Sequence, residues 1–295
     1  MSATLESNTA ATGGWLNRRN AMLIVGSALV GMALSRSAAA QQVTDTDILN
    51  FALNLAFLEA QFYTLAATGM TIDQAGLSTK SGSGTAGGTL TVKANAMVPF
   101  PTTLLKDFAT ELATEEQNHV KFLQSALAGS AVAMPNIDLM NSFNALASAA
   151  GLGSSFDPFA SELNFLLGAF IFEDVGVTAY LGAAGLISDK TYLDKAAGIL
   201  AVEAYHAGSI RLRVFQAGSA AQQAASKIAA ARASLDGTGN DDIGVGVSQG
   251  AATIVDADAN ALAFSRTTTQ VLKVVYGGGS AGGAFFPNGL NGTIK

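Results

Sequence analysis

The chain has 295 residues, of which 49% are apolar and 13% are charged, and its net charge is −6. This composition indicates a folded protein with a large buried core, neither disordered nor fibrous. The absence of cysteine excludes disulfides and thiolate-bound metals. A metal site would have to use carboxylate, imidazole, carbonyl or water ligands, which favours iron, manganese or zinc.

Residues 1–40 have the pattern of a secretory signal. Arg18 and Arg19 precede an apolar run at 21–34, and three alanines follow at 38–40. The paired arginines indicate the twin-arginine route, although the two residues after them depart from its consensus. A short membrane anchor is the alternative, but the run is too short to span a bilayer comfortably. We therefore predict cleavage after the three alanines and an exported protein, periplasmic or extracellular.

Cleavage would make the chain more acidic. It reduces the basic residues from 16 to 13 and the acidic residues from 22 to 21, so the net charge becomes −8. An acidic chain argues against nucleic acid or an anionic membrane as the main partner. We expect no stable membrane association after cleavage, and the sequence leaves a homodimer open.

Apolar residues at helical spacing predict an all-α chain with long connections. The connection at 70–100 is rich in Gly, Ser and Thr, and its β-like run at 88–94 would suit a hairpin. A second crossover, 130–159, contains a short helix near 139–150. The third long helix is apolar nearly all round, which is typical of a buried helix. The long helices are expected at 44–67, 101–129 (with Pro101 in the first turn), 159–185, 192–216 and from there to 235.

The last 60 residues differ from the rest. Residues 236–295 are rich in Gly, Asn and Asp, with one short helical piece at 267–276. We expect them to form an extension that packs on a helical bundle at 41–235. The run 236–242 faintly resembles a calcium loop but lacks the closing glutamate, so we interpret it as a solvated turn. The glycines at 277–283 lack the Lys-Ser/Thr of a phosphate loop.

Four glutamates and the chain's two histidines lie on the long predicted helices. Each histidine follows a glutamate by three residues, and residues so spaced share one helix face. A glutamate from each of two helices and Glu-x-x-His from each of two others is the ligand set of di-iron and di-manganese carboxylate bundles. With 8 glutamates in the chain, both histidines would acquire this spacing by chance roughly once in 1,000 sequences. The candidate metal ligands are Glu59, Glu116, His119, Glu173, Glu203 and His206.

These residues also have possible roles other than metal binding. A Glu-x-x-His pair is often a solvated ion pair, but the helical neighbours of Glu173 are apolar or aromatic, where a lone carboxylate is costly. Asp174 is an alternative as the polar residue at this place, with Glu173 at an edge. Glu115 points about 100° away from Glu116 around the helix. We interpret Glu115 as an exposed partner rather than a ligand.

Charge balance favours two ions. Four carboxylates and two divalent ions together are neutral, whereas the carboxylates alone repel one another, which raises some of their pKa values and weakens metal binding in acid. Tyr63 and Tyr180 lie one and two helical turns after Glu59 and Glu173. Either hydroxyl could bond a ligand or take part in one-electron chemistry, and a core aromatic with a satisfied hydroxyl is the alternative.

With these ligand positions, the chain resembles the ferritin-like superfamily, and it looks most like the secreted ferritin-like domain family that includes plant desiccation-related proteins. The closer match is carried by "LNLAFLEAQFYTLAATG" and by "FSRTTTQVLKVVYGGGSAGGAFFPNGLNG". The resemblance implies a four-helix bundle in which Glu116 and Glu203 bridge two metals. Glu59 with His119, and Glu173 with His206, would complete the two ends. The long first connection and the glycine-rich tail argue against a hollow storage shell, and the lack of cysteine argues against a complete rubrerythrin.

The predicted ligand set and the family resemblance together imply redox chemistry at two iron or two manganese ions. The partners would be oxygen or hydrogen peroxide, in Fe(II) oxidation or peroxide removal under oxidative or desiccation stress. We rank true catalase turnover lower, because the two Glu-x-x-His halves are alike and resemble bacterioferritin and rubrerythrin sites. The alternative is a non-catalytic binding or stress-protective protein whose metals only hold the bundle together.

Overall fold

The computed structural model describes residues 43–239, 241–248 and 250–295. The export signal predicted at 1–40 lies outside these residues. A short 3₁₀ turn, Ala128–Ser130, follows the second helix. The helices are α1 (Asp45–Thr68), α2 (Thr103–Leu127), α3 (Asn141–Ala149), α4 (Glu162–Ala184), α5 (Lys190–Gln216), α6 (Ser219–Asp236) and α7 (Thr268–Val275).

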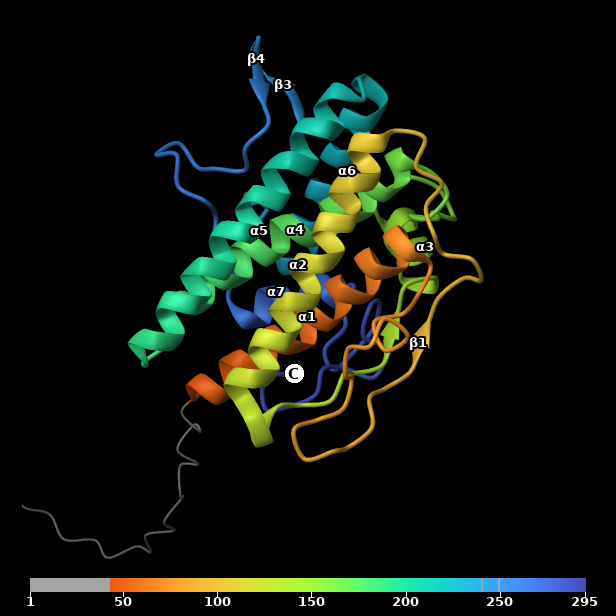
Figure 1. The fold of residues 1–295 in the computed structure, drawn as a ribbon. Coiled ribbons are helices and arrows are strands. Elements are labelled where there is room, and N and C mark those ends of the chain that lie inside the picture. Colours follow the sequence, from red (N-terminus) through yellow and green to blue (C-terminus); the bar gives the residue numbers. More distant parts are fainter. Residues whose placement is uncertain (1–42, 240, 249) are drawn as a thin grey trace, which may run out of the picture. The chain divides into compact units, whose positions relative to one another are not determined.

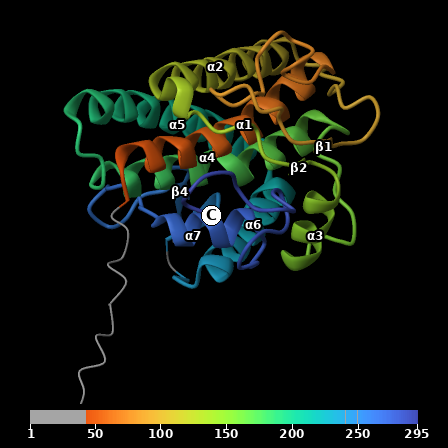
Figure 2. The ribbon, with the colours of Figure 1, turned by 90° about the horizontal axis from the view of Figure 1, so that it is seen from below.

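Four long helices form the bundle, and the predicted all-α class is confirmed. Helix α1 packs along α2, and α4 packs along α5 (Figure 1). Helices α6 and α7 lie on the side of α4 away from α2 (Figure 2). By length and composition α4 could cross a membrane, but 78% of its most apolar stretch is buried inside this protein. Its lack of a polar face therefore reflects a core position.

Local chemistry sets the helix ends. Thr44 caps α1 by accepting a hydrogen bond from the Asp47 amide, and Gly69 ends the helix in the left-handed region at φ 74°. Helix α2 begins at Thr103, two residues later than predicted from Pro101. The reason is that Thr102 is held extended, since its amide and hydroxyl donate to the Glu162 carboxylate at 2.7 and 2.9 Å.

The hairpin expected at 88–94 is not formed. Strand β1 (Leu90–Thr91) instead pairs in parallel with β2 (Ile137–Asp138) from the second crossover. Asn136 fixes this pairing, because its side-chain oxygen accepts the Thr89 amide at 2.8 Å. The two long connections are therefore tied to each other. An antiparallel hairpin occurs later, where β3 (Gly246–Ser248) pairs with β4 (Ala251–Thr253).

The tail is bound to the helices by buried ion pairs. Arg232 of α6 contacts Asp174 of α4 at 2.7 Å and Asp242 of the tail at 2.6 Å. Arg266 contacts Asp236 at 2.7 Å and Asp242 at 3.1 Å. The interpretation of 236–242 as a solvated turn is therefore wrong: its carboxylates are buried against arginines that lie close only in the folded chain.

The tail also covers α4 and α1. The Arg266 amide donates to the Thr178 carbonyl of α4 at 2.9 Å, and the Asn291 amide donates to the Asn54 side chain of α1 at 3.0 Å. The rings of Phe285 and Phe172 meet edge to face, with centroids 4.9 Å apart. Residues after 236 thus pack on the bundle, while the boundary at 235/236 stays a prediction.

We expect Arg232→Met to destabilise the fold by about 3 kcal/mol, because removing one partner of a buried ion pair leaves uncompensated charge on Asp174 and Asp242. The value lies at the low end of the range because each aspartate keeps a second arginine partner. Urea unfolding followed by circular dichroism measures the change. Lys195→Met is the matched control, since Lys195 pairs with Asp194 on the surface, where such pairs contribute less than about 1 kcal/mol. Equal midpoints for both variants would contradict the assignment.

Candidate metal centre

The bundle brings all six predicted ligands into its interior. Helix α1 supplies one glutamate and α4 supplies another, while α2 and α5 each supply a Glu-x-x-His pair on one face. None of the six is more than 8% exposed. Ionisable groups so deeply buried need partners or a bound ion. The six are Glu59, Glu116, His119, Glu173, Glu203 and His206.

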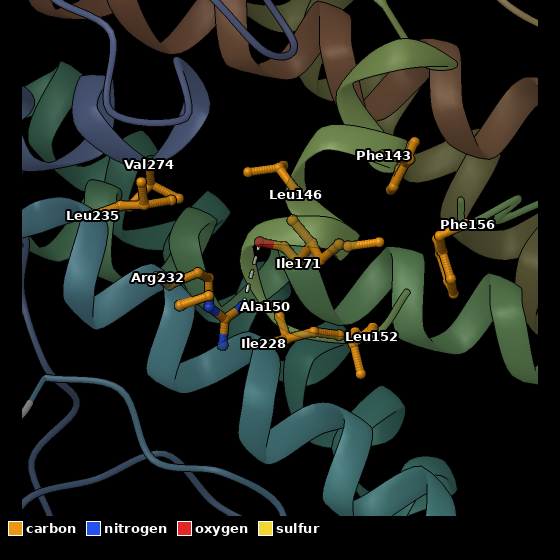
Figure 3. A pocket seen from close by; sticks show the side chains of 12 residues that line it. Phe143, Leu146, Ala150, Leu152, Phe156, Ile171, Ile228, Arg232, Leu235 and Val274 are labelled. Atoms are coloured by element: carbon orange, nitrogen blue, oxygen red, sulfur yellow. Dashed lines mark hydrogen bonds between the residues drawn. The ribbon is translucent and has the colours of Figure 1, made fainter. Parts of the chain in front are cut away.

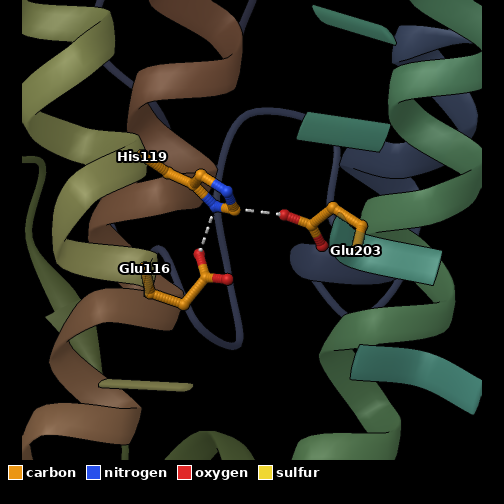
Figure 4. Close-up of side chains that lie close together, drawn as sticks. All are labelled: Glu116, His119 and Glu203. Carbon is orange, nitrogen blue, oxygen red and sulfur yellow. Dashed lines mark hydrogen bonds and ion pairs between the residues drawn. The ribbon is translucent and has the colours of Figure 1, made fainter. Parts of the chain in front are cut away.

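Two three-residue groups form within this set. In the first, Glu116, His119 and Glu203 each offer a ligand atom, and these atoms lie within 4.8 Å of one another. His119 Nδ1 is 3.1 Å from Glu116 Oε2 and 3.6 Å from Glu203 Oε1 (Figure 4). The group thus joins α2 to α5 across the bundle.

The second group joins α2, α4 and α5. His206 Nδ1 lies 3.3 Å from Glu116 Oε1 and 3.4 Å from Glu173 Oε2. Glu116 therefore belongs to both groups, one oxygen facing each histidine, as a bridging position requires. Glu203, the other bridging residue implied by the resemblance, belongs only to the first group.

Glu59 stands beside the two groups rather than in either of them. It lies near Gly176 of α4: a Cβ atom built at Gly176 would meet the Glu203 carboxylate and would lie 3.5 Å from Glu59 Oε1. Glycine at this position leaves room for both carboxylates between α1 and α5. The sequence could not reveal that role, because a glycine inside a helix has several possible reasons.

Several buried donor atoms in the described part of the chain lack a hydrogen-bond partner, and their positions indicate whether a metal ion would fit. Among the described residues, the buried side-chain atoms without a hydrogen bond include Glu116 Oε1, Glu173 Oε2, Glu203 Oε2 and His206 Nδ1. These atoms belong to the two groups just described. Buried acceptors without a proton donor are costly, and a divalent cation removes that cost. Carboxylate and imidazole donors fit iron, manganese or zinc.

Burial and mutual repulsion shape the ionisation of these groups. Burial, with the Glu116 and Glu173 charges added, raises the pKa of Glu59 well above its usual range. Burial likewise raises the pKa of Glu203. Burial opposes ionisation of Glu116 too, but hydrogen bonds and charge from both histidines hold its pKa at about 2. Carboxyl groups that retain protons must lose them when a cation binds, so metal uptake is linked to proton release.

Two further side chains hold the Glu173–His206 end. The Tyr63 hydroxyl of α1 donates to Glu173 Oε1, and His206 Nε2 lies 2.6 Å from Glu115 Oε2. The interpretation of Glu115 as an exposed partner needs correction. Its side chain is 39% exposed, yet it orients a buried imidazole so that Nδ1 faces Glu116 and Glu173. A histidine that binds metal usually donates its other ring nitrogen to such a carboxylate.

Asp174 has a separate role. Both Glu173 and Asp174 are buried, at 0% and 2% exposure, so the alternative that put Glu173 at an edge is wrong. Asp174 turns away from the centre and accepts from Arg211 at 2.8 Å and from Arg232 at 2.7 Å. Sequence spacing cannot reveal this role, because both arginines lie more than 35 residues further along the chain.

The chain matches the model of one protein family and is similar to two curated relatives. The model of the ferritin-like domain family matches residues 44–216, which hold all six candidate ligands. The desiccation-related protein PCC13-62 of Craterostigma plantagineum is 30% identical over 246 residues, covering 78% of this chain and 76% of its own. The ferritin-like catalase Nec2 of Nesocodon mauritianus is 27% identical over 269 residues, covering 85% and 84%. No solved structure matches at a significant level.

We expect Glu115→Ala to weaken Mn(II) binding about 10–100-fold, because the imidazole of His206 loses the carboxylate that fixes its orientation. Competition with a fluorescent chelator measures the affinity. Glu111→Ala is the matched control, since Glu111 lies one turn earlier on α2 and is exposed. An affinity for Glu115→Ala within twofold of this control would show that the contact does not position His206.

Proposed function

Because the chain belongs to the ferritin-like domain family, we propose that it is a metal-dependent oxidoreductase that consumes hydrogen peroxide at a dinuclear carboxylate centre. The observation that carries this proposal is a set of buried donor atoms without partners in the described chain, Oε1 of Glu116, Oε2 of Glu173, Oε2 of Glu203 and Nδ1 of His206, on residues of the two groups. Two groups that share Glu116 suit two ions. Iron and manganese both accept this donor set.

The reaction balances without an organic cofactor. Two redox-active ions held by these residues would supply the two-electron capacity for the reaction: one peroxide, with two electrons and two protons, gives two waters, and a second peroxide returns two electrons and two protons as it leaves as oxygen. The protein's part is to hold the donors and to exclude bulk water. The ring of Phe62 contacts those of Tyr63, Phe165 and Phe172, and the Tyr63 hydroxyl donates to Glu173. This apolar wall limits side reactions.

Two observations favour catalase-type turnover more strongly than the sequence alone did. Its lower rank there rested on two equivalent halves. Within residues 43–295 as described, however, the second nitrogen of His206 faces a carboxylate while that of His119 has none, and Glu173 alone of the four glutamates accepts from a tyrosine. The centre is therefore asymmetric. One relative also carries the name of a ferritin-like catalase. Fe(II) oxidation remains the alternative reaction of the same centre.

A second candidate is a structural centre. The four carboxylates come from four helices and are all nearly or fully buried, an arrangement that suits ions whose only task is to hold the bundle. In that case the metals stabilise the fold and do not turn over peroxide. In either case we propose that the protein is exported and serves a stress response, as the name of its desiccation-related relative suggests.

We expect two metal ions per chain after reconstitution with Mn(II) or Fe(II). Glu116→Ala should lose both ions, because Glu116 belongs to both groups, while Glu203→Ala should keep the ion at Glu173 and His206. Elemental analysis of the dialysed protein gives the ratio. If Glu116→Ala keeps two ions, Glu116 is not a shared ligand, and if the wild type takes up none, the centre does not exist.

We expect the Mn(II)-loaded protein to release one oxygen molecule for every two peroxide molecules consumed, as the balanced reaction requires. An oxygen electrode and the loss of peroxide absorbance measure both quantities. Peroxide loss without oxygen would indicate a peroxidase that needs an external reductant. A fully loaded protein that consumes no peroxide with either metal would leave the structural centre as the function.

A further inference from the structure

A cavity of about 30 Å³ lies against Glu59, between α1, α4 and α7. Gly176 and Tyr180 of α4, Val275 of α7 and Phe285 of the tail form part of its wall. A single buried water needs about 10–15 Å³ of such space, so a molecule of two or three heavy atoms fits. The tail thus closes a small chamber beside one end of the candidate centre.

A second cavity, also about 30 Å³, continues this chamber along α1 and α4. The two share Ala52, Leu55, Ala179 and Tyr180 on their walls, so they adjoin at Tyr180. Ala52 and Leu55 are partly exposed, as is Ala183 on the outer cavity. We call this pair of neighbouring cavities, which extends from partly exposed residues to Glu59, the route.

The side chains that line the route determine which molecules can enter it. Apart from the Glu59 carboxylate and the Tyr180 hydroxyl, every side chain around the inner cavity is apolar. A hydrated cation would have to give up its water there, which costs far more than such a wall returns. A small neutral molecule loses far less hydration free energy on entering the cavity. The route therefore suits a neutral oxidant and opposes a metal ion.

Tyr180 is free to bind that molecule. Its hydroxyl has no hydrogen-bond partner among the described residues, whereas Tyr63, at the other end of the centre, donates to Glu173. Burial and the nearby charges of Glu203 and Glu59 raise the pKa of Tyr180 well above its usual range, so the phenol keeps its proton. It can donate to one end of a short polar molecule while the other end faces Glu59.

We infer that the cavity between Glu59 and Tyr180 is the substrate site of the centre, and that its substrate is a small neutral hydroperoxide, hydrogen peroxide above all. This inference rests on the proposed function and deepens it. The substrate meets the centre at Glu59, while Tyr63 and Glu115 hold Glu173 and His206. Tyr180 binds the substrate through its hydroxyl, and the wall excludes hydrated ions and bulky alkyl hydroperoxides.

A neighbouring cavity provides a matched control. Another space of about 30 Å³ lies between α3, α4 and α6, and its wall is apolar apart from Arg232 (Figure 3). It shares Ile171 and Val274 with the wall of the inner cavity, but none of the six candidate ligands lines it. Ala179 lines the proposed substrate site and Ala147 lines the control cavity, and both are buried helical alanines. Replacing each with valine adds the same two carbons to a different space.

The experiment compares Ala179→Val, Ala147→Val and Tyr180→Phe with the wild type, all loaded with the same metal. Elemental analysis first establishes that metal content is unchanged. Xenon-pressurised crystals then show which cavities take up a small apolar probe. Stopped-flow measurements give the rate of nitric oxide binding to the Fe(II) form and the rate of peroxide consumption.

We expect Ala179→Val to lose xenon from the inner cavity and to slow both reactions at least about 10-fold, because added carbons fill a void of this size. Ala147→Val should stay within about twofold of the wild type, because the void it fills is not on the route. Tyr180→Phe should keep xenon and raise the KM for peroxide about 3–10-fold, the effect of one hydrogen bond.

Several results would overturn the inference. Fully loaded Ala179→Val that reacts with nitric oxide and peroxide as fast as the wild type shows that the route is not used. An inner cavity without xenon in the wild type shows that it admits no small molecule. If the wild type consumes no peroxide, the proposed function fails, and the rate of nitric oxide binding alone tests the route. Slower binding in Ala179→Val than in the wild type then supports the route, and an equal rate refutes it.

Discussion

Four carboxylates buried inside one helical core are the constraint on which the rest of this structure depends. Each would repel the others, and no lysine or arginine in the described part of the chain is paired with any of them. The two histidines offset part of that repulsion, and the rest raises the pKa of Glu59 and Glu203. A core of this kind is stable only with protons or cations in place. The packing of α1 on α2 and of α4 on α5 therefore serves to hold donor atoms together.

A second buried charge system fixes the tail to this core. Arg211, Arg232 and Arg266 bind aspartates of α4, α6 and the residues after 236. Breaking one such pair is costly, so the tail is bound by specific geometry rather than by apolar contact alone. The tail places Val275 and Phe285 over α1 and α4 and so closes the chamber next to Glu59. The arginine cluster thereby stabilises the wall of a cavity that it does not touch.

The sequence was sufficient for the bundle and for the burial of the six candidate ligands in it, because both follow from helical periodicity. Spacing of three residues predicted Glu116 beside His119 and Glu203 beside His206. The structure brings Glu116 and His119 together, but Glu203 contacts His119, and His206 contacts Glu116 and Glu173. Whether they bind metal stays a prediction. Contacts between distant segments escaped the sequence: the β1–β2 pairing, the partner of Glu115 and the arginine partners of Asp174. Each joins residues more than 35 positions apart, and no local pattern records such a contact.

Two helices carry neighbouring acidic residues that face different partners. On α2, Glu115 meets the outer nitrogen of His206 while Glu116 meets the inner one. On α4, Glu173 faces the centre while Asp174 faces the arginines. Adjacent positions point about 100° apart around a helix, so each pair fixes its helix against rotation as well as sliding. Insertion of one residue upstream within α2 or α4 would turn both carboxylates away from their partners at once. Changes in chain length are therefore tolerable in the long connections but not within these two helices.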